Sequence, residues 1–241
     1  MKRFYALLIV ALFATAPALM AQSASFYNAA RDAEKMIKKM PTENYHRAYV
    51  GINTAHANWK EYGLMGEIMF PINKGITLGY LESYHILKGL PVFVEYGANI
   101  QYLYGKETMS DIEILGMEFE SDYKTNLFAL NVPVNVAMRL SFENNTIAVT
   151  PYAGLNFRLN LMGKQVVSAE DLEVENKIFD KSDEGLGSDA FNRLQLGFNF
   201  GVAVSYDVYT LSIGRVSDFS RISKEGKGRL GVTTISVGYA F

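Results

Sequence analysis

Few side chains in this sequence have the chemistry for acid–base or nucleophilic catalysis. The chain contains no cysteine, and its three histidines are His46, His56 and His85. Catalysis by a hydrolase needs a base held close to a nucleophile and oriented by a third group. The sequence gives none of these histidines an obvious set of such neighbours. It therefore predicts no enzymatic activity, no cofactor and no metal centre.

Carboxylates are concentrated in two segments that lack a clear hydrophobic pattern, residues 105–124 and 162–192. Carboxylate oxygens are the ligands that Ca²⁺ and Mg²⁺ prefer. The run that begins at Asp180 resembles an EF-hand loop, but its twelfth position is Phe191 instead of a glutamate. We therefore expect solvated charge in both segments, with binding of divalent cations as the alternative. The acidic residues are Asp111, Glu113, Glu118, Glu120 and Asp122, then Glu170, Asp171, Glu173, Glu175, Asp180, Asp183, Glu184 and Asp189.

Most of the remaining chain alternates apolar residues with small or polar ones. A period of two describes a strand with one apolar face. The clearest example runs from Phe128 to Leu140, where Asn131, Asn135 and Arg139 share the polar face. The same pattern predicts eight strands, at about residues 47–57, 76–86, 92–104, 128–140, 147–161, 194–206, 208–216 and 232–241.

The connections between these predicted strands alternate between long and short. A transmembrane meander has this rhythm, because its turns are short on the periplasmic side and its loops are long outside. A lipocalin-like soluble barrel also has eight strands, but its outward face would be polar. Uncharged outward runs of Leu, Phe, Val and Tyr would aggregate in water. The prediction is therefore all-β, an eight-stranded antiparallel up-and-down transmembrane β-barrel with short periplasmic turns and long extracellular loops.

The polar faces of the strands would point into the lumen of this barrel. Eight strands leave an interior just wide enough for side chains to fill, so we expect a filled lumen and no open pore. Glu95 and Arg139 fall on the inward faces of neighbouring strands at similar depth. Because buried charges need partners, the sequence predicts a lumenal ion pair between these two residues.

Two positions disturb the alternation. Glu82 shares the parity of the outward-facing Ile76. Either a bulge near Gly79 shifts the register, or the assignment of this face of the strand to lipid fails; we place Glu82 with the lumenal pair. Pro133 cannot donate a hydrogen bond from within a central strand, and we expect a local bulge there.

The N-terminal residues predict export. Lys2 and Arg3 precede the apolar residues 4–16, a run that is short for a membrane-spanning helix. A basic start, a short apolar run and a small residue at position 21 form the pattern of a secretory signal peptide. We assign residues 1–21 to this signal peptide and expect it to be cleaved.

After the signal peptide, residues 22–45 have helical propensity and predict a periplasmic N-terminal extension. Residues 46–241 then form the barrel. Removing Lys2 and Arg3 changes the net charge from −2 to −4, which is too weak and too mixed to suggest nucleic-acid binding.

The segments Leu90–Gly97, Asn131–Val134, Pro151–Leu155 and Val237–Phe241 together resemble a known family. They are similar to the eight-stranded outer-membrane β-barrel proteins of Bacteroidetes-type bacteria, the PorT-like or OmpX-like group. The resemblance covers about residues 46–241. It implies a location in the outer membrane of a Gram-negative bacterium.

The resemblance and the predicted barrel lead to one principal hypothesis for function. The chain would be an integral outer-membrane protein with a filled lumen and a structural or interaction role through its extracellular loops. Its expected partners are outer-membrane lipid and lipopolysaccharide, the barrel-insertion machinery, and a protein partner at the loops. The alternatives are a PorT-like accessory role in protein secretion, and small-solute transport or lipid modification by a barrel enzyme.

The last predicted strand carries outward aromatic residues at Tyr239 and Phe241. The resemblance implies that they form the signal read by the barrel-insertion machinery. Deleting Phe241 is therefore expected to reduce insertion in cells while leaving refolding in detergent almost unchanged. Heat-dependent gel mobility measures the folded fraction in both settings. Equal losses in the two settings would show a structural role only.

Overall fold

The computed structural model describes residues 40, 42–58, 61–63, 66–68, 72–114, 117–142, 146–169, 172–179, 192–221 and 228–241 of the 241-residue chain. The predicted signal peptide lies outside the described residues, as do residues 22–39 and 41 of the predicted extension. Within the described part of the chain, no helix has the length and apolar character needed to cross a bilayer.

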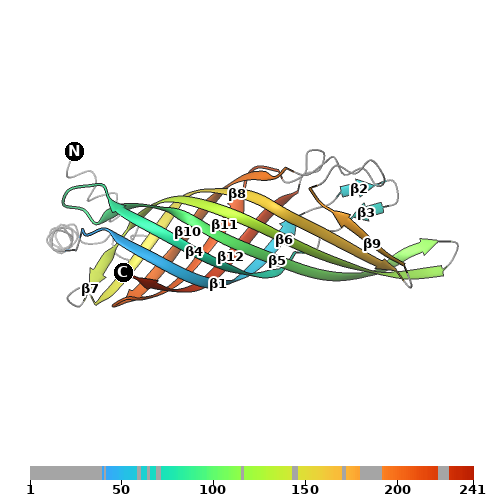
Figure 1. Ribbon diagram of the computed structural model, residues 1–241, viewed down its shortest axis with the longest axis horizontal. Coiled ribbons are helices and arrows are strands. Elements are labelled where there is room, and N and C mark those ends of the chain that lie inside the picture. The colour runs from blue at the N-terminus through green and yellow to red at the C-terminus, as the bar shows by residue number, and fades with distance from the viewer. Residues whose placement is uncertain are drawn as a thin grey trace, which may run out of the picture.

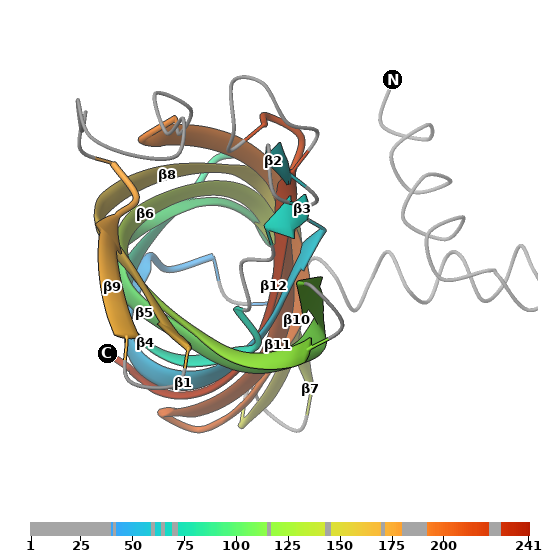
Figure 2. The ribbon, with the colours of Figure 1, turned by 90° about the vertical axis from the view of Figure 1, so that its right-hand side faces the viewer.

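Eight long antiparallel strands form a closed wall (Figures 1 and 2). They are β1 (Tyr45–Asn58), β4 (Lys74–His85), β5 (Val92–Ile114), β6 (Met117–Met138), β8 (Ile147–Ala169), β10 (Leu194–Tyr206), β11 (Tyr209–Asp218) and β12 (Arg229–Ala240). Four short strands complete the set: β2 (Glu61–Gly63) and β3 (Gly66–Ile68) form a hairpin, β7 (Leu140–Phe142) follows β6, and β9 (Leu172–Lys177) pairs with β8. The predicted eight-stranded barrel is confirmed.

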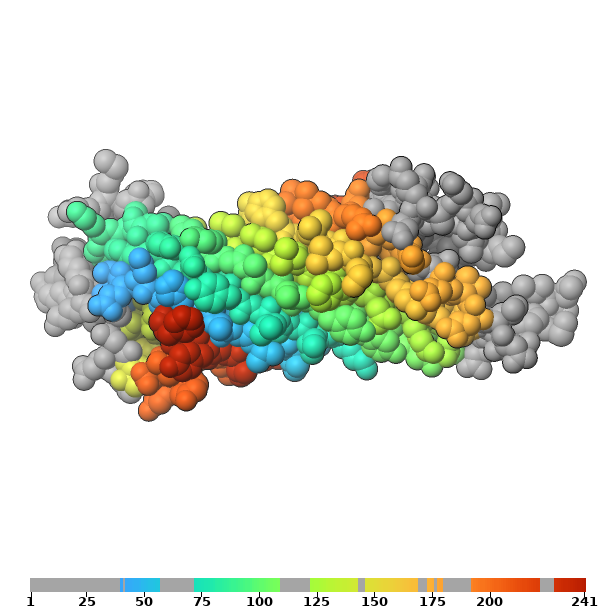
Figure 3. All heavy atoms as spheres, viewed as in Figure 1, coloured from blue at the N-terminus to red at the C-terminus, as the bar shows by residue number. Residues whose placement is uncertain are grey.

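The wall closes where the first and last strands meet. β1 pairs with β12 from Arg47 opposite Ala240 to Asn58 opposite Arg229. Figure 3 shows the two segments side by side, β1 in blue and the C-terminal residues in red. A closed barrel leaves no unpaired edge. This ladder supplies hydrogen-bond partners for the backbone groups along the facing edges of β1 and β12.

The short connections lie at the same end of the barrel as Tyr45 and Phe241. They follow β4, β7 and β10, and Asp207 in the last of them has a φ of 53°. Gly89, in the turn after β4, has a φ of 78°, which glycine adopts without steric cost. The three short turns predicted for one side of the barrel are therefore confirmed, and this side is the short-turn end of the barrel.

The acidic segments expected to be loops are largely strand. β5 continues to Ile114 and β6 begins at Met117, with one irregularity in pairing between Met109 and Ile112. β8 likewise continues to Ala169, and β9 returns alongside it. In the sequence of these extensions, polar residues occur at both odd and even positions, so the alternation that identifies a half-apolar strand is missing there.

The register differs from the two expected bulges. β4 pairs without interruption through Gly79 to both neighbours, so Glu82 stays on the outward face. No shift occurs at Pro133 either; β6 shifts against β8 between Phe128 and Ala129. The expectation that Glu82 joins a lumenal pair is therefore wrong, because no bulge turns its side chain inward.

Glycines let large lumenal side chains lie flat against the wall. A Cβ at Gly79 would collide with the ring of Tyr49 from β1. On the opposite side of the barrel, a Cβ at Gly201 on β10 would lie 2.5 Å from the hydroxyl of Tyr152, which is on the neighbouring strand β8. Small residues on one strand thus make room for an aromatic ring from the next, which is how a narrow barrel is filled.

Candidate functional site

The first charged cluster lies inside the barrel at the short-turn end, around Glu95 on β5. The Glu95 side chain is fully buried. The Tyr45 hydroxyl donates to its Oε1 at 2.6 Å, and the Ser83 hydroxyl donates to the same oxygen at 3.4 Å. Arg47 Nη2 lies 3.8 Å from Oε2. The Tyr45 ring packs edge-on against Phe93, so this cluster closes the short-turn end of the lumen.

Arg139 is not the partner of Glu95, so the predicted ion pair is wrong. Across the β5–β6 ladder, Glu95 faces Asn135, and Arg139 lies four residues beyond it, just past the end of β6. The Arg139 guanidinium instead lies over the Tyr45 ring, 4.7 Å from its centroid. Neighbouring strands alone suggest Arg139 as the partner, whereas the lumen is narrow enough for Arg47 to reach Glu95 from β1.

A second buried charge pair lies closer to the outer end of the lumen. Arg158 on β8 donates from Nη1 to Asp218 Oδ2 on β11, and neither side chain is accessible to solvent. Arg158 Nε also donates to Asn131 Oδ1 at 3.1 Å. This pair was not predicted from the sequence, because the predicted seventh strand ends at residue 216. Asp218 nonetheless continues the inward parity of Thr210.

Amide side chains bridge the strands between the two charged clusters. Asn131 Nδ2 donates to Asn99 Oδ1 at 3.0 Å, and Asn199 Nδ2 donates to Asn135 Oδ1 at 3.0 Å. A cavity of about 60 Å³ remains among them, bordered also by Arg47. A polar space of this size has room for a few ordered waters.

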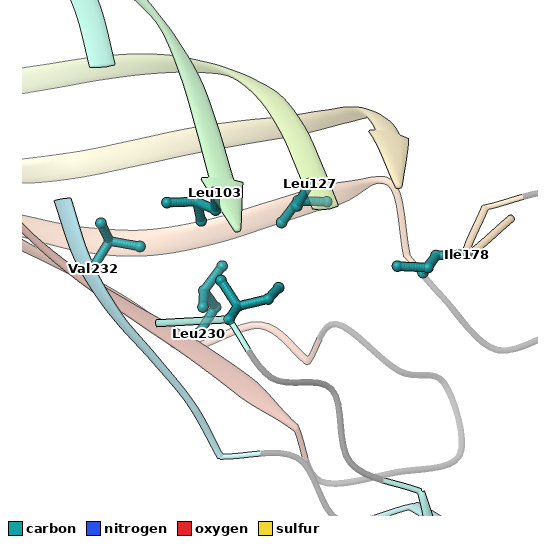
Figure 4. Close-up of a cluster of buried hydrophobic side chains, with 6 residues drawn as sticks. Leu103, Leu127, Ile178, Leu230 and Val232 are labelled. Carbon is teal, nitrogen blue, oxygen red and sulfur yellow. The ribbon is translucent and has the colours of Figure 1, made fainter. Parts of the chain in front are cut away.

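An apolar cluster closes the outer end of the lumen (Figure 4). Leu103, Leu127 and Leu230 come from the wall, and each is almost fully buried. Ile72, which precedes β4, and Ile178, which follows β9, pack onto them from the loop side. The lumen is therefore closed by charged and aromatic groups at one end and by aliphatic groups at the other.

The outward surface of the wall is apolar, with aromatic residues near the short-turn end. Aliphatic residues such as Val50, Ile52 and Leu78 are more than half exposed. A surface of this kind would drive aggregation in water. A closed antiparallel barrel with an outward apolar band, an aromatic girdle and long loops at one end is the architecture of bacterial outer-membrane barrels. The chain is an outer-membrane β-barrel protein. The girdle residues at the short-turn end are Tyr80, Tyr84, Tyr96, Tyr206, Tyr209, Tyr239 and Phe241.

Comparison with known proteins adds solved barrels of similar overall form. No protein-family model matches the chain, and no curated protein matches it in sequence. Ail, the attachment invasion locus protein of Yersinia pestis, is 12% identical with a TM-score of 0.42, covering 83% of this chain and 99% of Ail.

Two further solved structures resemble the chain to a similar degree. Neisserial surface protein A is 14% identical with a TM-score of 0.39, covering 82% of this chain and 97% of that protein. A major outer membrane protein from Thermus thermophilus is 12% identical with a TM-score of 0.43, covering 83% of this chain and 100% of that protein. The fold and the membrane placement of this chain rest on its own ladders and surface.

The histidines and the C-terminal aromatic residues occupy structural positions. His46 Nδ1 lies 2.8 Å from the Tyr80 hydroxyl, and His85 Nε2 lies 2.8 Å from the Leu90 carbonyl oxygen. His56 is exposed on the outward parity of β1. Phe241 exchanges two backbone hydrogen bonds with His46 and stacks on its ring at 5.8 Å. Tyr239, also outward, contacts the Phe241 ring; the role of these two residues in insertion stays a prediction.

The strand extensions beyond the outer end carry exposed ion pairs. Lys106 Nζ lies 2.7 Å from Asp122 Oδ2, and the Thr108 hydroxyl donates to the other carboxylate oxygen. These two contacts hold the pKa of the Asp122 carboxyl below its usual value. Lys164 Nζ lies 2.6 Å from Glu175 Oε2. Among the residues that the structure describes, no three His, Asp or Glu side chains converge to hold a metal ion.

The closed lumen predicts low conductance. The full barrel reconstituted in a planar bilayer should show no steady current steps above the level of bilayers treated with detergent alone. The physical reason is that charged and aromatic side chains fill one end of the eight-stranded interior, and aliphatic side chains fill the other. A steady, large single-channel conductance would contradict the filled lumen.

The buried pair predicts a large loss of stability when one member is removed. Asp218→Ala leaves Arg158 buried without a counter-charge, which is expected to lower the free energy of unfolding by about 3–5 kcal/mol. Urea titration of the barrel refolded in lipid vesicles measures this change. Arg158→Met combined with Asp218→Leu should recover much of the loss, because both charges are then absent.

A matched control separates this effect from a general response to removing a carboxylate. Asp207 is exposed in the turn between β10 and β11. Asp207→Asn should change stability by less than about 0.5 kcal/mol. If Asp218→Ala were as mild as Asp207→Asn, the Arg158–Asp218 pair would not be an important part of the folded lumen.

Proposed function

We propose that this outer-membrane barrel is an interaction protein that binds a protein partner through the sheet extending beyond its outer end. The extension consists of the outer parts of β5, β6 and β8 together with β9 (Figure 1). The observation that carries the proposal is that this sheet continues the wall but is not closed. In the described part of the chain, the outer edges of its two outermost strands, β5 and β9, pair with no further strand.

The free edges follow from the pairing pattern. β5 pairs with β4 only as far as Tyr104 opposite Lys74. In the described part of the chain, residues 105–114 therefore pair with β6 alone. β9 pairs with β8, and no second neighbour is found for it in the described part of the chain. An exposed strand edge presents a row of backbone donors and acceptors that can take up an extended segment of a partner.

The side chains on β9 suit contact with another macromolecule. Val174 is 53% exposed on this strand, between the exposed Glu173 and Glu175. Backbone pairing along the edge would supply affinity, and the alternating side chains would supply specificity. The free edges lie on the extracellular side. They therefore favour a partner outside the cell over the periplasmic partner that a PorT-like accessory of secretion would need.

The interior of the barrel supports an interaction role over transport. The cavity of about 60 Å³ is small, and side-chain clusters lie between it and both ends of the lumen. We propose no catalytic role for the chain. His46 and His85 are each held by a contact within the wall, far from the extracellular end.

The proposal predicts that the extension carries the biological phenotype. In a strain lacking the protein, a tip variant is made by excising residues 109–121 and 166–175 and closing each hairpin with Asn-Gly. The cut ends are register pairs, Thr108 with Asp122 and Gln165 with Asn176, so the wall should still fold. This variant is expected to insert normally, measured by heat-dependent gel mobility, but to fail to restore the phenotype.

A lumen variant is the matched control. Arg47→Gln with Glu95→Gln removes both charges of the inner pair while leaving the extension intact. It is expected to restore the phenotype fully. Restoration by the tip variant combined with failure of a folded lumen variant would overturn the proposal and favour a function inside the barrel.

A further inference from the structure

Glu82 is a carboxylate on the membrane-facing surface of the wall. It lies opposite His46 on β1 and Tyr96 on β5, within an uninterrupted register. Its place three residues before the end of β4 puts it beside the short turn, in the aromatic girdle. The girdle residues of a transmembrane barrel lie at the level of the lipid headgroups.

Three tyrosine hydroxyls converge on this carboxylate. Tyr96 and Tyr84 donate to Glu82 Oε2 at 3.0 and 3.3 Å, and Tyr80 donates to Oε1 at 3.5 Å. The rings of Tyr84 and Tyr96 are stacked in parallel, 5.6 Å apart. All three tyrosines are about 40% exposed, so their rings border the carboxylate and also face the bilayer.

The charge of Glu82 has no counter-charge among the described residues. Its contacts come from neutral hydroxyls, and the nearby His46 bonds to the Tyr80 hydroxyl instead. The two fully buried carboxylates of the lumen differ in this respect, since Glu95 faces Arg47 and Asp218 faces Arg158. A charged side chain on the lipid face is costly unless a partner is supplied.

We propose that Glu82, with Tyr80, Tyr84 and Tyr96, binds the primary ammonium group of a phospholipid headgroup of the ethanolamine type. A carboxylate has about four lone-pair sites, and the three tyrosines occupy three of them, which leaves one for an ammonium donor. Aromatic faces attract cations, so the rings add to the electrostatic attraction. The carboxylate thus gains a counter-charge that no described residue of the chain supplies.

The position of the site favours a lipid over a lysine from another protein. The surrounding outward residues are apolar, among them Leu78 and Ile100 at 62% and 45% exposure, and they face the hydrocarbon of the bilayer. A molecule that reaches Glu82 along this wall must lie within the leaflet. Lipids whose headgroup bears an ammonium meet both the depth and the charge requirement.

The test is native mass spectrometry of the full barrel, purified in detergent and titrated with lipids of identical acyl chains. Phosphatidylethanolamine should be retained about three- to tenfold more strongly than phosphatidylglycerol, which carries no ammonium. Glu82→Gln should remove this preference. Tyr96→Leu should reduce it, because the ring and hydroxyl are lost while the charge remains.

The control variant is Asp207→Asn, which removes an exposed carboxylate from the same end of the barrel and should keep the preference. A comparison that needs no substitution uses an ethanolamine lipid whose amine is N-acylated, which the wild-type barrel should retain no better than phosphatidylglycerol. Equal retention of all three lipids by the wild-type barrel, or an unchanged preference in folded Glu82→Gln, would overturn the proposal. Loss of a co-purifying protein from Glu82→Gln without any lipid preference would also overturn it, in favour of a protein amine.

Discussion

The ladder between β1 and β12 is the interaction on which every other feature of this protein depends. Inside a bilayer no water is available to the backbone, so each N–H and C=O must find a partner within the chain. The pairing of Val50 with Val237 and its neighbours converts an open sheet into a wall with no edge. Once the wall is closed, alternate side chains must enter a narrow interior, and the others must face lipid.

The enclosed interior explains why its polar groups form local clusters instead of a path. Eight strands leave room for side chains only, and charges in that space need partners. Arg47 with Glu95 and Arg158 with Asp218 satisfy each other across the lumen. The amides between them join strands that are distant in sequence. A lumen built in this way contributes rigidity and leaves the surfaces of the barrel, its outer sheet and its girdle, to meet other molecules.

The sequence predicted the parts of the fold that the membrane constrains. Alternation identified the eight wall strands and the inward faces of Glu95 and Asn131, because lipid requires one apolar face. It failed above the membrane, where the strands ending at Ile114 and beginning at Met117 need no apolar face and resemble a loop. It also failed for the partner of Glu95, because contacts across the lumen depend on strand tilt and register. Glu82 remained ambiguous since parity alone does not exclude a bulge.

The length of β5 has a consequence for where a partner can be met. A strand of 23 residues, rising about 3.3 Å per residue and tilted by about 40°, has a height of roughly 55–60 Å. The apolar band of such a barrel is only about 25 Å tall, so roughly 30 Å of the strand stands clear of the hydrocarbon. The tip therefore reaches well above the headgroups on a rigid support. A soluble partner could bind there without touching the bilayer at all.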